Sequence, residues 1–264
     1  MKLSIVVPVL NEAAVLPQLL EALHALAAQG CEVIVADGGS TDGTIEIVRS
    51  SADDRADSNA QDSTLDAGAG AGAGAGLTLV HAPRGRARQM NAGAADASGD
   101  VLLFLHADTV LPDGALQAIA QALGHIDSSA DTAASKRKPG QQRACWGRFD
   151  VRITGRSPML AVIARMMNWR SRLTGIATGD QAMFVRRAAF DAVGAFPDLP
   201  LMEDVALSSR LRALSHPACI TLPVLTSGRR WETRGLWRTI WLMWRLRFAY
   251  WRGVPASVLA DAYR

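Results

Sequence analysis

Residues 101–116, VLLFLHADTVLPDGAL, begin as an apolar run and place His106 and Asp108 where that run ends. Such a short apolar run is typical of a strand that is buried on both faces of a sheet. Three other runs have this character, namely LSIVVPVL at 3–10, CEVIVADGG at 31–39 and LTLVHAP at 77–83. The segments between them favour helices. This alternation predicts an α/β protein with a mostly parallel central sheet flanked by helices.

The second half of the chain continues the sheet in a more mixed form. CWGRFDVRI at 145–153 alternates like a half-buried strand, SPMLAVIARMMNWRSRL at 157–173 has helical spacing, and QAMFVRRAAFDAVGAF at 181–196 favours a strand and then a helix. Polar stretches near 51–76 and 125–143 lack a periodic apolar face, which predicts disordered insertions. We expect a single domain over 1–226, followed by a helical segment over 227–264.

Composition excludes several classes of protein. A chain of 264 residues, 49% hydrophobic and with a formal charge of +3, suits a globular domain and not a general polyanion binder, so no nucleic-acid partner is expected. The cysteines Cys31, Cys145 and Cys219 are too scattered for a zinc site or a disulfide framework and favour a cytoplasmic protein. The N-terminal apolar run is broken by Pro8 and Asn11, so it predicts a first strand and not a signal peptide.

Polar groups follow four of the expected strands, where open α/β sheets bind their ligands. One such residue alone is usually a turn or cap residue, but four strand ends in succession favour a ligand site. DGGSTDGT at 37–44 is neither a dinucleotide fingerprint nor a P-loop, because it lacks the required glycine spacing and the G-K-[ST] ending. The residues at the strand ends are Asn11, Glu12, Asp37, Arg84, Arg86, Arg88 and Asp108.

At these motifs the chain resembles the inverting family 2 glycosyltransferases of the GT-A type. The resemblance rests on SIVVPVLNE at 4–12, VIVADGGSTDGT at 33–44, GRARQMNAGAADASGD at 85–100 and FLHADTVLP at 104–112. In the second half, the segment from GIATGDQAMF to EDVALSSRLR at 175–212 is similar to the acceptor and catalytic portion of the bacterial subgroup described as radical-SAM/selenodomain-associated transferase 2. The resemblance implies a GT-A fold, a nucleotide-diphosphate sugar as donor and an acceptor that the sequence does not identify.

The resemblance also implies roles on the donor side. Asp37 matches the position that contacts the nucleobase, although a helix-cap role stays open. Asp108 matches the last position of the D-x-D element and would bind Mg²⁺ or Mn²⁺ beside the diphosphate. His106 replaces the first acidic residue of that element, and it can contact ribose or phosphate, assist the metal, or pack. Other donor-site candidates are Pro8, Asn11, Glu12, Arg84, Arg86 and Arg88, with plain solvated charge as the alternative for some of the arginines.

On the catalytic side, LMEDVAL at 201–207 resembles the E-D element of the family. Asp204 would take the proton from the acceptor hydroxyl, and Glu203 would bind or orient the acceptor. An ordinary acidic helix start is the alternative for both. Asp180 lies in ATGDQAMF at 177–184, which resembles the loop that contacts the donor sugar and the acceptor.

The C-terminal segment 227–253 carries an aromatic stripe beside an arginine stripe. It is too charged to span a bilayer, but it suits the interface of a membrane with anionic headgroups, where a lipid-linked acceptor would be found. Two alternatives stay open. The aromatic face can pack on the sheet, or Arg229, Arg230 and Trp231 can close over the donor diphosphate.

Two functions of different classes follow from this sequence. The first is a metal-dependent sugar transferase, located in the cytoplasm or peripherally at the inner face of the membrane. The second is a non-catalytic nucleotide-binding or membrane-surface protein, which the departure at His106 keeps open.

Overall fold

The computed structural model describes residues 1–51, 77–124 and 144–263, so the two predicted insertions lie outside the described residues. The chain forms two compact units, Lys2–Asp108 and Thr109–Arg264, and Met1 is grouped with the second. The boundary expected at residue 226 stays a prediction.

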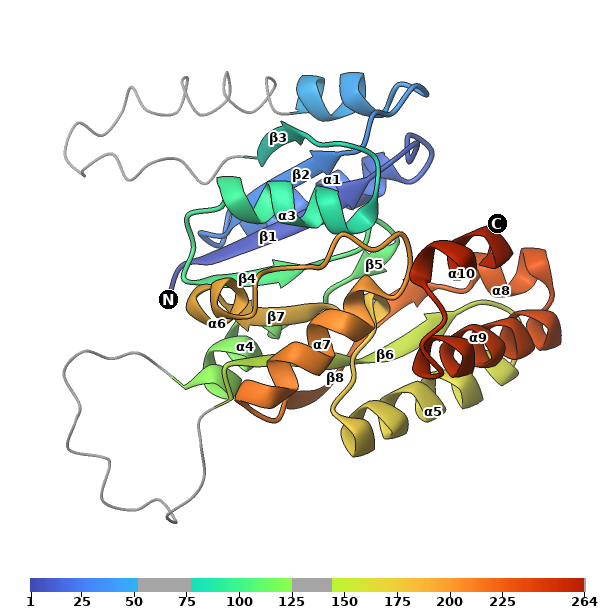
Figure 1. The fold of residues 1–264 in the computed structure, drawn as a ribbon. Helices are drawn as coiled ribbons and strands as arrows, with labels where there is room; N and C mark the ends of the chain where they lie inside the picture. Colours follow the sequence, from blue (N-terminus) through green and yellow to red (C-terminus); the bar gives the residue numbers. More distant parts are fainter. Residues whose placement is uncertain (52–76, 125–143, 264) are drawn as a thin grey trace, which may run out of the picture. The chain divides into compact units, whose positions relative to one another are not determined.

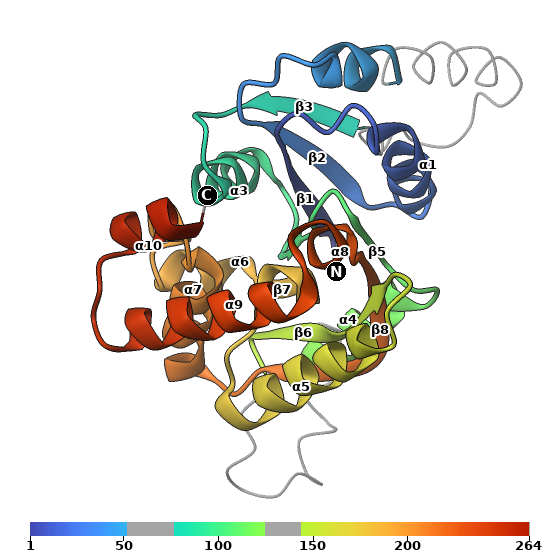
Figure 2. The same cartoon turned by 90° about the vertical axis from the view of Figure 1, so that its right-hand side faces the viewer.

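The unit Lys2–Asp108 contains four parallel strands in the order β3-β2-β1-β4 (Figure 1). The central strands are buried on both faces, because neighbouring residues such as Val6 and Val7 are both fully inaccessible to solvent. Helices α1 and α3 lie on opposite faces of these strands (Figure 2). The parallel pairing and the two helices together confirm the expected parallel sheet flanked by helices. The elements are β1 (Leu3–Val9), α1 (Leu16–Ala27), β2 (Glu32–Asp37), a helix at 44–51, β3 (Leu77–His81), α3 (Arg86–Asp96) and β4 (Val101–Phe104).

The unit Thr109–Arg264 has the mixed sheet expected from the sequence, in the strand order β7-β6-β8-β5. Strands β6 and β8 are parallel, whereas β7 is antiparallel to β6 and β5 is antiparallel to β8. Trp146, Phe149 and Phe184 fill its core. The first elements are β5 (Thr109–Val110), α4 (Ala115–Leu123), β6 (Trp146–Thr154), α5 (Met159–Thr174), the 3-10 turn η2 (Gly179–Gln181), β7 (Met183–Arg186), α6 (Arg187–Ala192), α7 (Glu203–Leu214) and β8 (Ala218–Ser227).

The C-terminal segment forms three helices, α8 (Arg229–Arg234), α9 (Leu236–Trp251) and α10 (Ala256–Tyr263). Gly235, with φ of 83°, separates α8 from α9, because residues other than glycine rarely adopt this conformation. Pro255 lies just before α10, a position that suits proline because the first turn of a helix does not use its N–H groups in internal hydrogen bonds. Across residues 1–51, 77–124 and 144–263, no helix has both the length and the apolar character needed to cross a membrane.

Candidate functional site

The loops that follow β1 and β2 are tied together by hydrogen bonds. The main-chain N–H of Asn11 donates to Ser40 Oγ and that of Thr41 to Asn11 Oδ1, both at 2.9 Å. The N–H of Glu12 donates to Thr44 Oγ1 at 2.9 Å. Asn11 has φ of 55°, a left-handed conformation that asparagine tolerates better than most residues. The structure therefore brings Asn11 and Glu12 onto the loop that follows Asp37.

Asp37 ends β2 and is fully buried. Its Oδ2 accepts the N–H of Gly39 at 2.8 Å, and both carboxylate oxygens lie 3.2 Å from the N–H of Ser40. Oδ2 is also 3.9 Å from His81 Nδ1. These contacts hold the turn after β2 and do not cap a helix, because the next helix begins at residue 44. The contact of Asp37 with a nucleobase stays a prediction.

Gln89 of α3 supports the loop that follows β2 by hydrogen bonds to the ends of β1 and β2. Its side-chain Nε2 donates to the carbonyl oxygens of Val9, at 2.6 Å, and Ala36, at 3.0 Å. A Cβ atom at Gly38 would lie 2.8 Å from the Gln89 amide carbon, so only glycine fits here without displacing the glutamine. Pro8 is half-buried in β1 and lies opposite Ala36 in the sheet.

Arg84, Arg86 and Arg88 are exposed and gather around the beginning of α3. The helix follows Gly85, which has φ of 137°. Three cations at a helix N-terminus oppose the helix dipole, whereas an anion bound there would be favourable both to the dipole and to the arginines. The structure thus groups these residues as a candidate site for an anion.

His106 and Asp108 follow β4 in a turn, where His106 is half-buried and Asp108 is exposed. Neither at this turn nor anywhere else in the residues that the structure describes are three or more His, Cys, Asp or Glu side chains grouped to hold a metal ion. An exposed carboxylate still fits Mg²⁺ or Mn²⁺, because these ions can bind through one or two carboxylates together with phosphate oxygens and water.

The second group of candidates lies at the beginning of α7, in the other unit. The main-chain N–H of Gly179 donates to Asp204 Oδ2 at 2.8 Å, and the N–H of Val205 donates to Asp204 Oδ1 at 2.7 Å. The half-buried Asp180 is next to Gly179, and Glu203 is 3% exposed. The structure therefore joins η2 to the Glu203–Asp204 pair.

Arg170 is a residue of this site that the sequence did not indicate. Its Nε and Nη2 atoms are buried, and neither has a hydrogen-bond partner among the residues placed in the structure. Burial is the main cause that lowers the pKa of the Arg170 guanidinium. The negative charges of Asp204 and Asp180 raise this pKa, whereas the positive charge of Arg148 lowers it further. A buried cation near two candidate carboxylates is a typical sign of a functional site.

The C-terminal helices pack behind Asp204. Leu246 of α9 and Leu259 of α10 form one buried cluster with Met202, which precedes α7 and has φ of 67°. The aromatic stripe of α9 points the other way, since Trp237, Trp241, Trp244, Phe248 and Trp251 are between 59% and 78% exposed. The interpretation that this stripe packs on the sheet is therefore wrong, because α9 buries its opposite face.

Arg229 and Arg230 are exposed on α8. Arg230 donates a hydrogen bond to the Tyr263 hydroxyl, and its guanidinium lies 5.2 Å from the centre of that ring. These contacts attach α8 to α10. A role of this segment over the diphosphate stays a prediction.

Two residues that were not predicted each support one of the two groups of candidates, Asp42 the loops after β1 and β2, and Ser208 the beginning of α7. Asp42 Oδ2 accepts the N–H of Ala13 at 3.0 Å, and Ser208 Oγ donates to the carbonyl oxygen of Asp204 at 2.8 Å. Asp42 lies in the quoted DGGSTDGT motif, so its spacing from Asp37 could have indicated it. Ser208 has no comparable signal, because the sequence does not show that this serine, one helical turn after Asp204, is fully buried.

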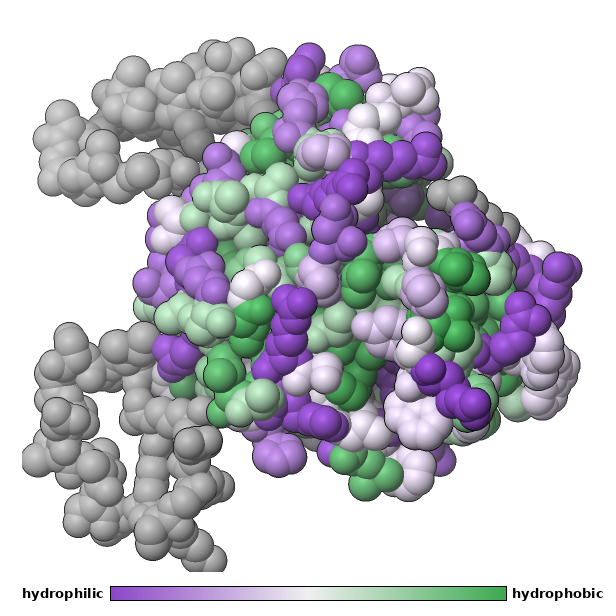
Figure 3. All heavy atoms as spheres, in the orientation of Figure 1, coloured by the Kyte–Doolittle hydropathy of each residue, from purple (hydrophilic) through white to green (hydrophobic). Residues whose placement is uncertain are grey.

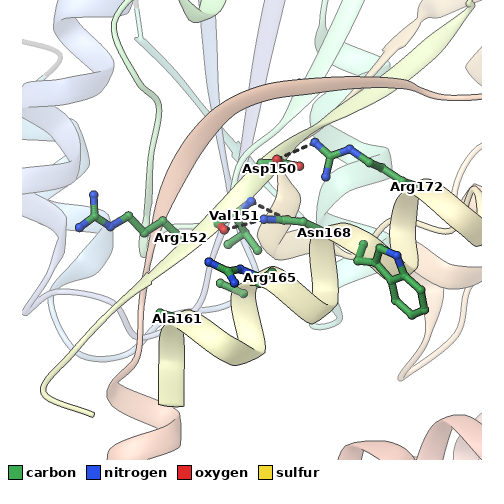
Figure 4. Close-up of a pocket in the computed structure, with 9 residues that line it drawn as sticks. Asp150, Val151, Arg152, Ala161, Arg165, Asn168 and Arg172 are labelled. Atoms are coloured by element: carbon green, nitrogen blue, oxygen red, sulfur yellow. Dashed lines mark hydrogen bonds and ion pairs between the residues drawn. The ribbon is translucent and has the colours of Figure 1, made fainter. Parts of the chain in front are cut away.

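A pocket of about 530 Å³ lies between β6 and α5 (Figure 4), and none of the predicted site residues lines it. Arg172 reaches Asp150 there, with Nη2 2.6 Å from Oδ2. Asn168 exchanges two hydrogen bonds with the main chain of Val151, at 2.9 and 3.0 Å. Arg152 and Arg165 complete the polar lining.

Residues 4–194 match the family described as Glycosyl transferase family 2. No curated protein matches the chain.

Several solved structures have the same fold. The mannosyltransferase PcManGT from Pyrobaculum calidifontis, in complex with GDP-Man and Mn²⁺, is 21% identical with a TM-score of 0.59, over 94% of this chain and 61% of that one. TarS 1-349 of S. aureus is 18% identical with a TM-score of 0.54, over 86% and 61%. Glucosyl-3-phosphoglycerate synthase from Mycobacterium tuberculosis is 16% identical with a TM-score of 0.52, over 84% and 70%.

These likenesses confirm the expected GT-A fold. The chain spans 61% of the length of the mannosyltransferase. The family match covers both the loops around Asp37 and the turn at Asp108, as well as η2. The chain therefore belongs to glycosyl transferase family 2.

Proposed function

We propose that the protein transfers a sugar from a nucleotide-diphosphate donor to an acceptor hydroxyl, with inversion at the anomeric carbon. The observation that carries this proposal is the orientation of Asp204. Its carboxylate is held by the N–H groups of Gly179 and Val205 at the first turn of α7, and a fixed carboxylate is what a general base requires.

In this reaction Asp204 accepts the proton of the acceptor hydroxyl as its oxygen attacks the anomeric carbon. The bond from that carbon to the diphosphate breaks, and the nucleoside diphosphate leaves with the bonding electrons. Glu203, buried beside the base, orients the acceptor, and Asp180 contacts the sugar from η2.

On the donor side, the loop at Asp37 holds the nucleobase, with Pro8, Asn11 and Glu12 bordering the nucleotide. The exposed arginines at the beginning of α3, Arg84, Arg86 and Arg88, attract the diphosphate. Asp108 would hold Mg²⁺ or Mn²⁺, and a cation there would neutralise charge on the leaving group. His106 contacts the ribose or phosphate beside it.

The solved relatives support this assignment of donor class and cation. PcManGT is described in complex with GDP-Man and Mn²⁺, TarS in complex with UDP-GlcNAc, and the mycobacterial synthase with UDP and Mn²⁺. The segment at 175–212 further supports membership in the radical-SAM/selenodomain-associated subgroup.

The test is calorimetric titration with UDP, GDP, CDP and dTDP, with and without Mn²⁺. We expect Mn²⁺-dependent binding of one nucleotide, lost in Asp108→Ala and kept in Asp113→Ala, which removes another exposed carboxylate. Asp204→Asn should keep nucleotide binding and lose turnover by more than about 100-fold. If none of the four binds to folded protein, the proposal is wrong. If Asp204→Asn turns over normally, a non-catalytic role for this carboxylate follows.

We also propose that the protein works peripherally at a membrane and that its acceptor is lipid-linked. The support is the exposed aromatic stripe of α9, beside which Arg245 lies 5.0 Å from the Trp241 ring centre. Replacing Trp241 and Trp244 with serine should abolish flotation of the protein with lipid vesicles. Flotation that is unchanged in this variant would contradict the proposal.

A further inference from the structure

Helix α5 carries a second exposed apolar stripe, on the same unit as α9. Val162, Met166, Trp169 and Leu173 are between 47% and 65% exposed. Their spacing of four, three and four residues is also that of Trp237, Trp241, Trp244 and Phe248 on α9. Residues at this spacing share one helix face, so each helix presents a continuous apolar face to solvent.

The two helices are neighbours on the outside of their unit in both ribbon views (Figures 1 and 2). The space-filling view shows pale and green atoms mixed with purple ones over this region (Figure 3). Exposed apolar side chains scattered singly need no explanation, but a contiguous patch marks an interaction site.

The charged residues within these two helices are all of one sign, and the one carboxylate that lines the pocket beside α5, that of Asp150, is paired with Arg172. Neither α5 nor α9 contains an aspartate or a glutamate, whereas each contains three arginines. Aromatic residues with arginines at their flank are typical of helices that lie in the interface of an anionic membrane.

The pocket beside α5 adds a place for a headgroup. Trp169 borders it together with Arg152 and Arg165 (Figure 4). Both arginines are exposed, and neither forms an ion pair with any residue that the structure describes. A guanidinium matches the oxygens of a phosphate.

We infer that the exposed stripes of α5 and α9 form one surface, the α5–α9 face, that docks on an anionic lipid bilayer, with the pocket at Arg152 and Arg165 receiving a lipid phosphate. This inference rests on the peripheral membrane contact proposed above, and it assigns to α5 and the pocket the selection of anionic lipid.

The experiment uses the full chain and vesicles of phosphatidylcholine, with and without 30% phosphatidylglycerol, in a flotation assay that is read by tryptophan fluorescence. Wild-type protein should bind only the anionic vesicles. Trp169→Ser with Leu173→Ser should weaken that binding more than about ten-fold. Arg165→Gln should weaken it about five-fold, since one arginine near such a surface contributes ~1 kcal/mol. The control, Leu214→Ser with Leu222→Ser, removes exposed leucines of α7 and β8 and should bind like wild type.

The outcomes separate the two proposals. If the α9 variant loses binding and the α5 variants do not, the role of α5 is overturned and contact through α9 stands. If wild type binds neither vesicle, both membrane proposals fail, while nucleotide binding still tests the transferase independently. Equal binding to neutral vesicles overturns the charge selection. If the variants instead convert a dimer to a monomer without any vesicle binding, the face is a subunit interface and the inference is wrong.

Discussion

Replacing Gly38 with alanine tests how the loop after β2 is supported. The new methyl carbon would lie 2.8 Å from Cδ, 2.9 Å from Nε2 and 3.0 Å from Oε1 of Gln89. The residue does not have a positive φ, so alanine introduces no backbone strain of its own and the effect is steric. The buried amide of Gln89 must therefore move away.

The magnitude follows from the hydrogen bonds that this movement breaks. Gln89 donates to the carbonyls of Val9 and Ala36, and Val9 keeps a second donor, the N–H of Gly38, at 3.0 Å. Each hydrogen bond of this kind contributes about 0.5–1.5 kcal/mol to stability. With both bonds of Gln89 lost, Gly38→Ala should lower the free energy of unfolding by about 2 kcal/mol.

The assay is a double-mutant cycle measured by urea unfolding. In the Gln89→Ala background the obstacle is gone, so Gly38→Ala should cost less than about 0.5 kcal/mol there, a coupling of about 2 kcal/mol. Gly39→Ala is the matched control, because its φ of 89° makes alanine strained while nothing lies near its Cβ. Its cost should be equal in both backgrounds. If the cost of Gly38→Ala is the same with and without Gln89, the reasoning is refuted.

Three further substitutions test charged groups. Burial raises the pKa of Glu32, but hydrogen bonds from Ser4 and Ser98 lower it more, so this pKa lies below its ordinary value. Glu32→Gln should therefore destabilise the protein at pH 7, and urea midpoints should converge with wild type as the pH falls through the carboxyl pKa, whereas a constant gap would contradict this. Arg148 is fully buried, so Arg148→Met should cost about 3–5 kcal/mol in thermal unfolding, and a loss below about 1 kcal/mol would argue against its ion pair. Arg170→Met removes a guanidinium with two unpartnered atoms, so it should raise Tm by a few degrees and lower the transfer rate; a raised Tm with an unchanged rate would exclude a role beside Asp204.

The first unit could be predicted from the sequence because its strands are continuous apolar runs. β1, β2 and β4 are each almost entirely buried, so their signal does not depend on which face is inside. β8 was not expected, because only two of its ten residues, Val224 and Thr226, are buried and Pro223 interrupts the run. Its place is set by pairing with β6, which no local pattern encodes.

The site shows the same division between local and tertiary information. Asp37, Asp108 and Asp204 were predicted as site residues because each stands in a recognisable motif. Arg170 lies in an ordinary helical pattern, and only the packing of α5 gives it its surroundings. Sequence periodicity likewise found the aromatic stripe of α9 but not the direction in which it points.

The two faces of α9 connect the proposed catalytic residues on α7 with the exposed aromatic stripe. The buried face of α9 packs on Met202, whose left-handed conformation immediately precedes Glu203 and Asp204, while the opposite face carries the exposed tryptophans. A non-glycine residue is held in this conformation only where its surroundings enforce it, so the packing of α9 against Met202 also fixes the first turn of α7. Leu246→Ala should therefore lower the transfer rate as well as the stability, although Leu246 lies on a different helix from the base. Equal rates for this variant and wild type, measured on folded protein, would show that α9 serves the outer surface alone.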